Sequence, residues 1–367
     1  CPLRSQVVAS TGGGYGYRIH PRLADAARDG AQPSPRLRRR CICDAARSTD
    51  PISSESIWAA ARYRAQFETI VTTVFRSLDR PAYLTVGEVR NRKLMLNFFA
   101  HAHNVTETDN TVMTVISVQL DHNGTVECER SRERFQTGRL DIRCVDLGGW
   151  LPDPFFGKRV HAGSGSCVYN MLIWTKPEIF LSAVRASQHD VIMIDTDVVM
   201  YHDLFKLSRQ IREQHNYKVI VASENHGYHN PNTGVVLASK SGTEVLEWWT
   251  DVNLDFVSSF AGDQSAFLDL AKTTSNFWVH VGMFNPSMVG QCGIPGAWAT
   301  HYNCLGGQKM SVMIHQSDWS DEVAKQYKFG RHRNNSLRTN WSGPRTWNDD
   351  DDAIQTMTAA GDWLIEE

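Results

Sequence analysis

Residues 190–200 read Asp-Val-Ile-Met-Ile-Asp-Thr-Asp-Val-Val-Met, an apolar run followed directly by two carboxylates. Val191 to Ile194 are all apolar and three of them are β-branched, which is typical of a strand buried on both faces of a parallel sheet. Asp195 and Asp197 would lie at the carboxyl end of that strand, where open α/β sheets bind ligands. Two such oxygen donors suit Mn²⁺ or Mg²⁺, although an Asp-Thr-Asp triplet taken alone is more often a turn or a cap. The interpretation therefore depends on the rest of the chain.

The composition indicates a globular protein without the basic surface that nucleic-acid binding requires. The 367 residues are 41% hydrophobic and carry a formal net charge of −2. This length allows one large domain or two small ones, and the near-neutral charge argues against nucleic acid as a partner. No apolar run is long enough to cross a bilayer. Because the chain begins at Cys1 rather than Met, we expect membrane contact only through an upstream anchor, if one precedes it.

Cysteines and glycosylation triplets together favour an oxidising, secretory compartment. None of the eight cysteines forms a Cys-x-x-Cys pair, so a zinc ribbon is not expected. Cys128 and Cys144 flank one helix–strand unit and are candidates for a disulfide. Four triplets match the N-glycosylation pattern: Asn104-Val-Thr106, Asn123-Gly-Thr125, Asn334-Asn-Ser336 and Asn340-Trp-Ser342.

The hydrophobic pattern divides the chain into three parts. Residues 1–50 are rich in Arg, Gly, Pro and Ser and predict a stem or extended arm. Residues 51–320 predict the central domain, including an N-terminal helix, and residues 321–367 a C-terminal extension.

Within the central domain, strands and helices alternate, which predicts a mainly parallel α/β sheet flanked by helices. Residues 93–100 fit either a helix or a strand with its turn, and Asp121 to Gly124 is typical of a turn. The helix over 169–186 contains Pro177, which is tolerated only near a helix start. Strands are predicted over 111–120, 142–147, 191–194 and 218–222, and helices over 53–78, 125–134, 169–186, 204–215, 244–249 and from 262 onward.

Three further polar segments follow the acidic pair. Pro231-Asn-Thr-Gly234 predicts a tight polar turn entering an apolar strand, so Asn232 would face the same cleft as the carboxylates. Asp263 and Gln264 open a helix, where Asp263 serves either as a sugar contact or simply as an N-cap. Residues 299–309 combine a potential metal ligand, a Gly pair and a cation: His301, Gly306, Gly307 and Lys309.

The chemistry that needs all of these segments is the transfer of a sugar from a nucleotide diphosphate. Its leaving group concentrates negative charge, which a divalent cation stabilises as a Lewis acid. Asp197 would bind the metal directly, Asp195 would contact the metal or the ribose, and a neutral His301 would be the third ligand.

The remaining candidates would bind the donor. Gly306 and Gly307 let the backbone approach the diphosphate, and Lys309 neutralises it as a point charge. Asn232 and Asp263 are placed to hydrogen-bond sugar hydroxyls.

The order of these motifs resembles metal-dependent glycosyltransferases of the GT-A fold. More narrowly, the chain resembles glycosyltransferase family seventy-seven, the plant and algal nucleotide-diphospho-sugar transferases, over roughly residues 90–315 by motif order. This resemblance rests on DVIMIDTDVVMYHDLF, on LMLNFFAHAHN followed by VISVQLD, and on Cys128. The segment THYNCLGGQK is also similar to xyloglucan xylosyltransferases.

The resemblance implies transfer of arabinose, xylose or galactose from a UDP-sugar, with Mn²⁺ or Mg²⁺, to a glycoprotein or glycan acceptor. Hydroxyproline-rich wall glycoproteins in the Golgi lumen are the acceptors that the family suggests. It also implies retention of configuration, in which Asp263 or Gln264 stabilises the positively charged sugar; in an inverting enzyme Asp263 would be the base. The alternative is a non-catalytic carbohydrate-binding or wall-structural protein with the same fold, which the intact Asp195, Asp197 and His301 disfavour.

Overall fold

The computed structural model describes residues 68–148, 167–224, 230–256, 262–291, 296–303 and 320. The predicted stem and C-terminal extension lie outside these residues, as do Gly306, Gly307 and Lys309. Of the helix predicted over 53–78, the described part is helical over 68–76. None of the helices in the described ranges is long and apolar enough to span a membrane.

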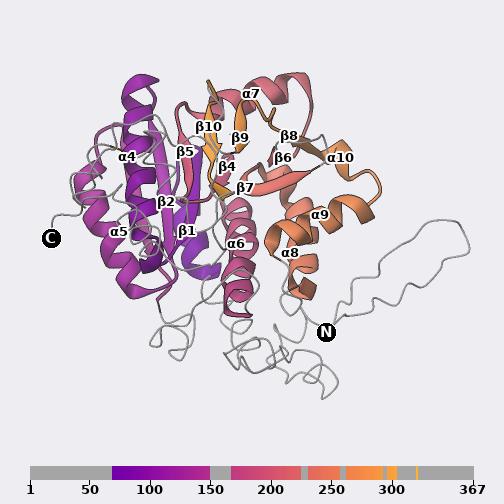
Figure 1. Cartoon of the computed structure of the whole chain (residues 1–367), viewed down its shortest axis with the longest axis horizontal. Helices are drawn as coiled ribbons and strands as arrows, with labels where there is room; N and C mark the ends of the chain where they lie inside the picture. Colours follow the sequence, from indigo (N-terminus) through magenta and orange to yellow (C-terminus); the bar gives the residue numbers. More distant parts are fainter. Residues whose placement is uncertain are drawn as a thin grey trace, which may run out of the picture.

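A seven-stranded mixed sheet forms the centre of the described fold, with helices on both of its faces (Figure 1). Its strands lie in the order β3-β2-β1-β4-β7-β6-β8. Neighbouring strands run parallel except at β7, which is antiparallel to both β4 and β6. The strands are β1 (Ala82–Gly87), β2 (Met113–Gln119), β3 (Leu140–Asp146), β4 (Val191–Ile194), β6 (Val219–Ser223), β7 (Pro231–Ala238) and β8 (Val281–Met283).

Two hydrophobic cores enclose the sheet, one on each face. Successive residues of β4 alternate between them, because side chains of a strand point to opposite faces: Val191 and Met193 face one core, Ile192 and Ile194 the other. The first core is covered by the helix over 68–76, α6, α8 and α9, and the second by α4, α5 and α7. The helices are α4 (Arg92–Thr108), α5 (His122–Phe135), α6 (Cys167–Ala186), α7 (Leu204–Gln214), α8 (Thr243–Phe256), α9 (Asp263–Thr273) and α10 (Phe277–His280).

A second, three-stranded sheet lies beyond the carboxyl end of β4. It has the order β5-β10-β9, with β5 (Val198–Met200), β9 (Val289–Gln291) and β10 (Ala299–His301). β10 pairs antiparallel with β5, so that His301 lies opposite Val198, the residue after Asp197. This register carries a late residue of the chain to the end of β4.

The predicted fold class, a mainly parallel α/β sheet flanked by helices, is confirmed, and so are the predicted strands and most helices to within a few residues. The open choice at 93–100 resolves as helix α4. Asp121 to Gly124 does not form a separate turn: Asp121 caps α5, with its side chain accepting from the Gly124 amide. Here a local turn signal serves as a helix start.

Two predictions about the backbone are wrong. Residues 231–234 are not a turn but the start of β7, because β6 pairs with Pro231 and Asn232 and the Asp195 amide after β4 donates to the Gly234 carbonyl. Pro177 lies in the middle of α6 rather than near its start. The apolar residues after it, including Ile179, Phe180 and Val184, are fully buried, and this packing offsets the lost backbone hydrogen bond.

A disulfide joins Cys128 of α5 to Cys144 of β3, which confirms the predicted pair. It fastens the helix to the edge strand of the large sheet. The two cysteines are 16 residues apart, and a loop of this size costs the unfolded chain appreciable entropy when it is closed.

We expect Cys128→Ala/Cys144→Ala to lower the free energy of unfolding by about 3 kcal/mol, the effect of opening a loop of this length. Urea denaturation measures the change. The wild-type protein kept in reductant provides the control, since it should lose the same stability without any change of sequence. Equal stability of the oxidised and reduced wild type would contradict the role of this cross-link.

Candidate metal and donor site

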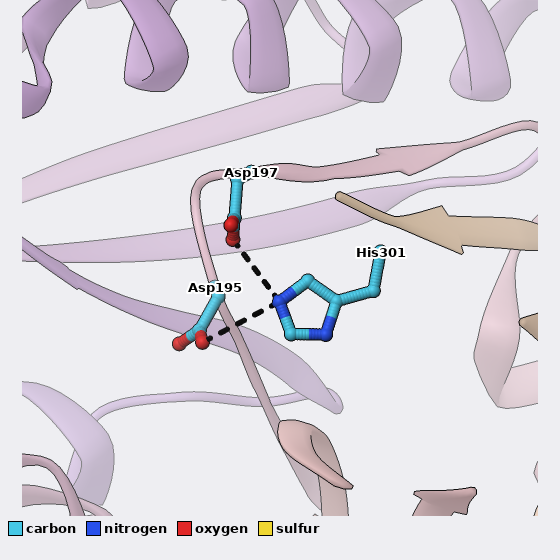
Figure 2. A group of neighbouring side chains, drawn as sticks. All are labelled: Asp195, Asp197 and His301. Carbon is cyan, nitrogen blue, oxygen red and sulfur yellow. Dashed lines mark ion pairs between the residues drawn. The ribbon is translucent and has the colours of Figure 1, made fainter. Parts of the chain in front are cut away.

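Asp195, Asp197 and His301 come together at the carboxyl end of β4 (Figure 2). His301 Nε2 lies 3.3 Å from Asp197 Oδ1 and 3.8 Å from Asp195 Oδ2. One ligand atom from each of the three residues lies within 4.8 Å of the others. The structure thus brings together the three residues that the sequence predicts as metal ligands.

Each of the three side chains is held by the main chain around it. A tight turn separates β4 from β5, with the Val198 amide donating to the Asp195 carbonyl. The Asp195 amide donates to the Gly234 carbonyl of β7, and the Tyr302 amide after His301 donates to the Asp197 carbonyl. Backbone hydrogen bonds therefore fix all three residues relative to one another.

Asn232 orients the imidazole of His301. Its Oδ1 lies 2.8 Å from His301 Nδ1 and also accepts from the Gly234 amide at 2.9 Å. Because the amide nitrogen of Gly234 can only donate, it assigns the oxygen of the Asn232 side chain to this position. His301 Nδ1 thus faces an acceptor, and this contact turns Nε2 toward the two carboxylates.

Gly234 provides the space that the imidazole occupies. A Cβ built at Gly234 would lie 2.1 Å from Cε1 and 2.4 Å from Nδ1 of His301, closer than any real contact. Any side chain at this position would displace the ring. The oxygen–oxygen–nitrogen donor set, with its imidazole aimed and buried, fits Mn²⁺ or Mg²⁺.

Lys176 of α6 is a part of the site that the sequence analysis missed. Its Nζ lies 2.8 Å from Asp195 Oδ1 and 3.1 Å from Asp263 Oδ2. Burial acts to lower the pKa of Lys176, but the two carboxylates outweigh it and hold that pKa above its usual value. In the sequence Lys176 is only a cation beside Pro177 in a mostly apolar helix. This local pattern does not indicate which carboxylates it will pair with.

Burial raises the pKa of the Asp195 carboxyl above its usual value. The ammonium of Lys176 opposes this rise, and the negative charge of the neighbouring Asp197 adds to it. Asp197 itself is only 5% exposed. The site therefore concentrates negative charge in a place with little solvent to screen it.

Asp263 and Gln264 join the site from the first turn of α9. The N-cap of α9 is Gly262, so Asp263 is not the cap; its Oδ2 accepts from the Thr233 hydroxyl at 3.1 Å and pairs with Lys176. Gln264 Oε1 accepts from Asn232 Nδ2 at 3.3 Å. The Asn232 side chain, predicted to hold sugar hydroxyls, is thus engaged by its protein neighbours.

Comparison with known families assigns this region. Residues 153–324 match the family model described as nucleotide-diphospho-sugar transferase. This segment of the chain is therefore similar to nucleotide-diphospho-sugar transferases. The chain is an enzyme of the glycosyltransferase class, as the motif order predicts. A comparison with curated proteins gives no match.

Solved glycosyltransferase structures resemble the transferase domain only distantly. Mouse xyloside xylosyltransferase 1 is 12% identical, with 62% of this chain and 99% of that chain covered and a TM-score of 0.44. The galactosyltransferase LgtC is 10% identical, with 66% and 99% covered and a TM-score of 0.44. The bifunctional enzyme WbbM is 10% identical, with 69% and 52% covered and a TM-score of 0.42.

We expect Gly234→Ala to lower the affinity for Mn²⁺ by at least about 10-fold, because the new methyl group displaces the His301 ring. Titration calorimetry of the purified protein with Mn²⁺ measures this. Gly138→Ala is the matched control, since a Cβ there meets nothing within 4 Å. If both variants bind Mn²⁺ like the wild type, the ring position does not matter for the metal.

We expect Lys176→Met to lower the free energy of unfolding of the metal-free protein by about 3 kcal/mol at neutral pH, since it leaves two carboxylates without their cation. Urea denaturation without added metal measures the loss. Lys272→Met, on an exposed position of the same fold, should change stability by less than about 0.5 kcal/mol. Equal, small effects of both substitutions would show that Lys176 does not stabilise the site.

Proposed function

We propose that the domain transfers a sugar of the arabinose, xylose or galactose class from a UDP-sugar to a glycoprotein or glycan acceptor, with Mn²⁺ or Mg²⁺ and with retention. The observation that carries the proposal is the convergence of Asp195, Asp197 and the oriented imidazole of His301 in the transferase domain. An isolated pair of aspartates would be consistent with a simple turn. A turn does not explain why a third potential ligand, His301 of a separate sheet, lies against the same two carboxylates.

In this proposal Asp195, Asp197 and His301 hold the metal ion, which when bound supplies positive charge opposite the diphosphate leaving group. Lys176 binds Asp195 Oδ1 and leaves Oδ2, the oxygen nearer to His301, facing the ligand cluster. Gly306, Gly307 and Lys309 follow β10 closely in the chain and would hold the diphosphate. These three assignments come from the sequence pattern alone.

The surroundings of Asp263 support retention over inversion. An inverting enzyme needs a carboxylate free to take the acceptor proton. Within the described residues, Asp263 is committed to Lys176 and Thr233, and nearby Glu224 accepts from Gln264 and from Asn230. The neighbouring Gln264 is an amide and cannot act as a base. In a retaining reaction the departing phosphate accepts the proton instead.

The sugar class and the hydroxyproline-rich acceptor rest on the motif resemblance, and the secretory location rests on covalent features. The Cys128–Cys144 disulfide is typical of an oxidising compartment. Asn104 and Asn123, which open two of the glycosylation triplets, are exposed on α4 and α5. Both features favour a Golgi-lumen enzyme.

The proposal predicts that the protein with Mn²⁺ releases UDP from at least one of UDP-arabinose, UDP-xylose and UDP-galactose, and faster with a glycopeptide acceptor. Asp197→Asn should lower Mn²⁺-dependent UDP binding by more than about 100-fold, since losing a direct ligand exceeds the cost of losing an outer partner. Calorimetry measures binding, and a coupled UDP assay measures turnover.

Asp141→Asn provides the control, because Asp141 lies on the edge strand β3 and pairs only with Arg143 among the described side chains. Proton NMR of the product reports its anomeric configuration, and an inverted product would overturn the retention proposal. Failure of every donor, or UDP binding that ignores Asp197→Asn, would overturn the metal-dependent reaction.

A further inference from the structure

Glu224 follows β6 directly, beside the candidate metal site, and its side chain is half-buried. Its amide donates to the Asn230 carbonyl at 2.8 Å, and its Oε2 accepts from Asn230 Nδ2 at 2.9 Å. Its Oε1 accepts a close hydrogen bond from Gln264 Nε2. Glu224 is thus held by Asn230 on one side and holds Gln264 on the other.

The charge of Glu224 gives these hydrogen bonds a direction. An ionised carboxylate only accepts, so the NH₂ group of Gln264 must face Glu224 and its amide oxygen must point the other way. That oxygen accepts from Asn232 Nδ2, which turns the oxygen of Asn232 toward Gly234 and His301. Every donor in the chain then faces an acceptor.

The chain ends at the metal ligand. With the Asn232 oxygen on Nδ1, the imidazole of His301 is held so that Nε2 faces Asp197, 3.3 Å away. If Gln264 were reversed, its NH₂ group would meet the NH₂ group of Asn232, and the chain would break. The Gly234 amide and the Gln264 oxygen select the same orientation of Asn232 from two sides.

We propose that Glu224 is a positioning residue of the metal site: through Gln264 and Asn232 it holds the imidazole of His301 in the orientation that can bind a divalent cation. This inference rests on the proposed function for its purpose, but the order of donors and acceptors belongs to the metal-free protein.

The test uses Glu224→Gln, which keeps the shape but can present either end of its amide to Gln264. We expect the affinity of Glu224→Gln for Mn²⁺ alone to fall about 10-fold by calorimetry. In the ¹⁵N NMR spectrum of the metal-free protein the imidazole signals of His301, identified by their loss in His301→Gln, should shift in Glu224→Gln because the hydrogen bond to Nδ1 changes.

Two further variants separate the proposed route from a general loss of structure. Gln264→Ala should reproduce the loss of affinity, and adding Glu224→Gln to it should cost little more, since both act along one path. Glu244→Gln, an exposed carboxylate on α8, should leave the His301 signals and Mn²⁺ affinity unchanged.

Unchanged His301 signals and Mn²⁺ affinity in Glu224→Gln would overturn the inference, as would fully additive effects of the two substitutions. Binding of Mn²⁺ alone also separates this inference from the proposed function. If Glu224→Gln binds Mn²⁺ more weakly than the wild type but the wild type turns over no UDP-sugar, the proposed reaction fails while the role of Glu224 stands.

Discussion

The candidate metal site depends on the close approach of the His301 imidazole to the backbone of Gly234. The ring occupies the volume that any Cβ at this position would fill. This approach in turn requires β7 to run antiparallel to β4, because only then does the start of β7 lie beside the end of β4. One reversed strand in an otherwise parallel sheet thus places Asn232 and Gly234 next to Asp195. If β7 ran parallel to β4, its first residues would lie beside the amino end of β4, away from Asp195.

Charge around the site is balanced for a divalent ion. Among the described residues, three carboxylates, those of Asp195, Asp197 and Asp263, face one ammonium from Lys176, which leaves two negative charges when His301 is neutral. Bringing these groups into a poorly solvated pocket is unfavourable unless cations compensate them. Lys176 supplies one compensation permanently, and a divalent metal ion would supply the other. The same balance explains why the pKa of Asp195 rises through burial in spite of the lysine at 2.8 Å.

The sequence predicted the parts of this architecture that are local. An apolar run ending in two carboxylates defines β4 and its acidic pair, and the order of the polar motifs placed His301 with them. It failed where tertiary pairing decides the conformation: residues 231–234 carry turn residues, yet they form a strand because β6 pairs with Pro231 and Asn232 and the rest of β7 pairs with β4. Lys176 and Glu224 have no local pattern at all. Each gains its role from partners that are distant in the chain: Lys176 from Asp195 and Asp263, and Glu224 from Gln264.

The first turn of α9 connects the two halves of the site. Asp263 reaches Lys176, and through it Asp195, whereas the next residue, Gln264, reaches Asn232 and Glu224. The indole of Trp249, a fully buried residue, donates to the Asp263 carbonyl and fixes this turn against the core. The start of α9 reaches the carboxylate ligand Asp195 through Asp263 and Lys176, and the imidazole ligand His301 through Gln264 and Asn232. These two paths fix the positions of the two ligands relative to each other. Such preorganisation lets binding energy act on the transition state rather than on ordering the ligands.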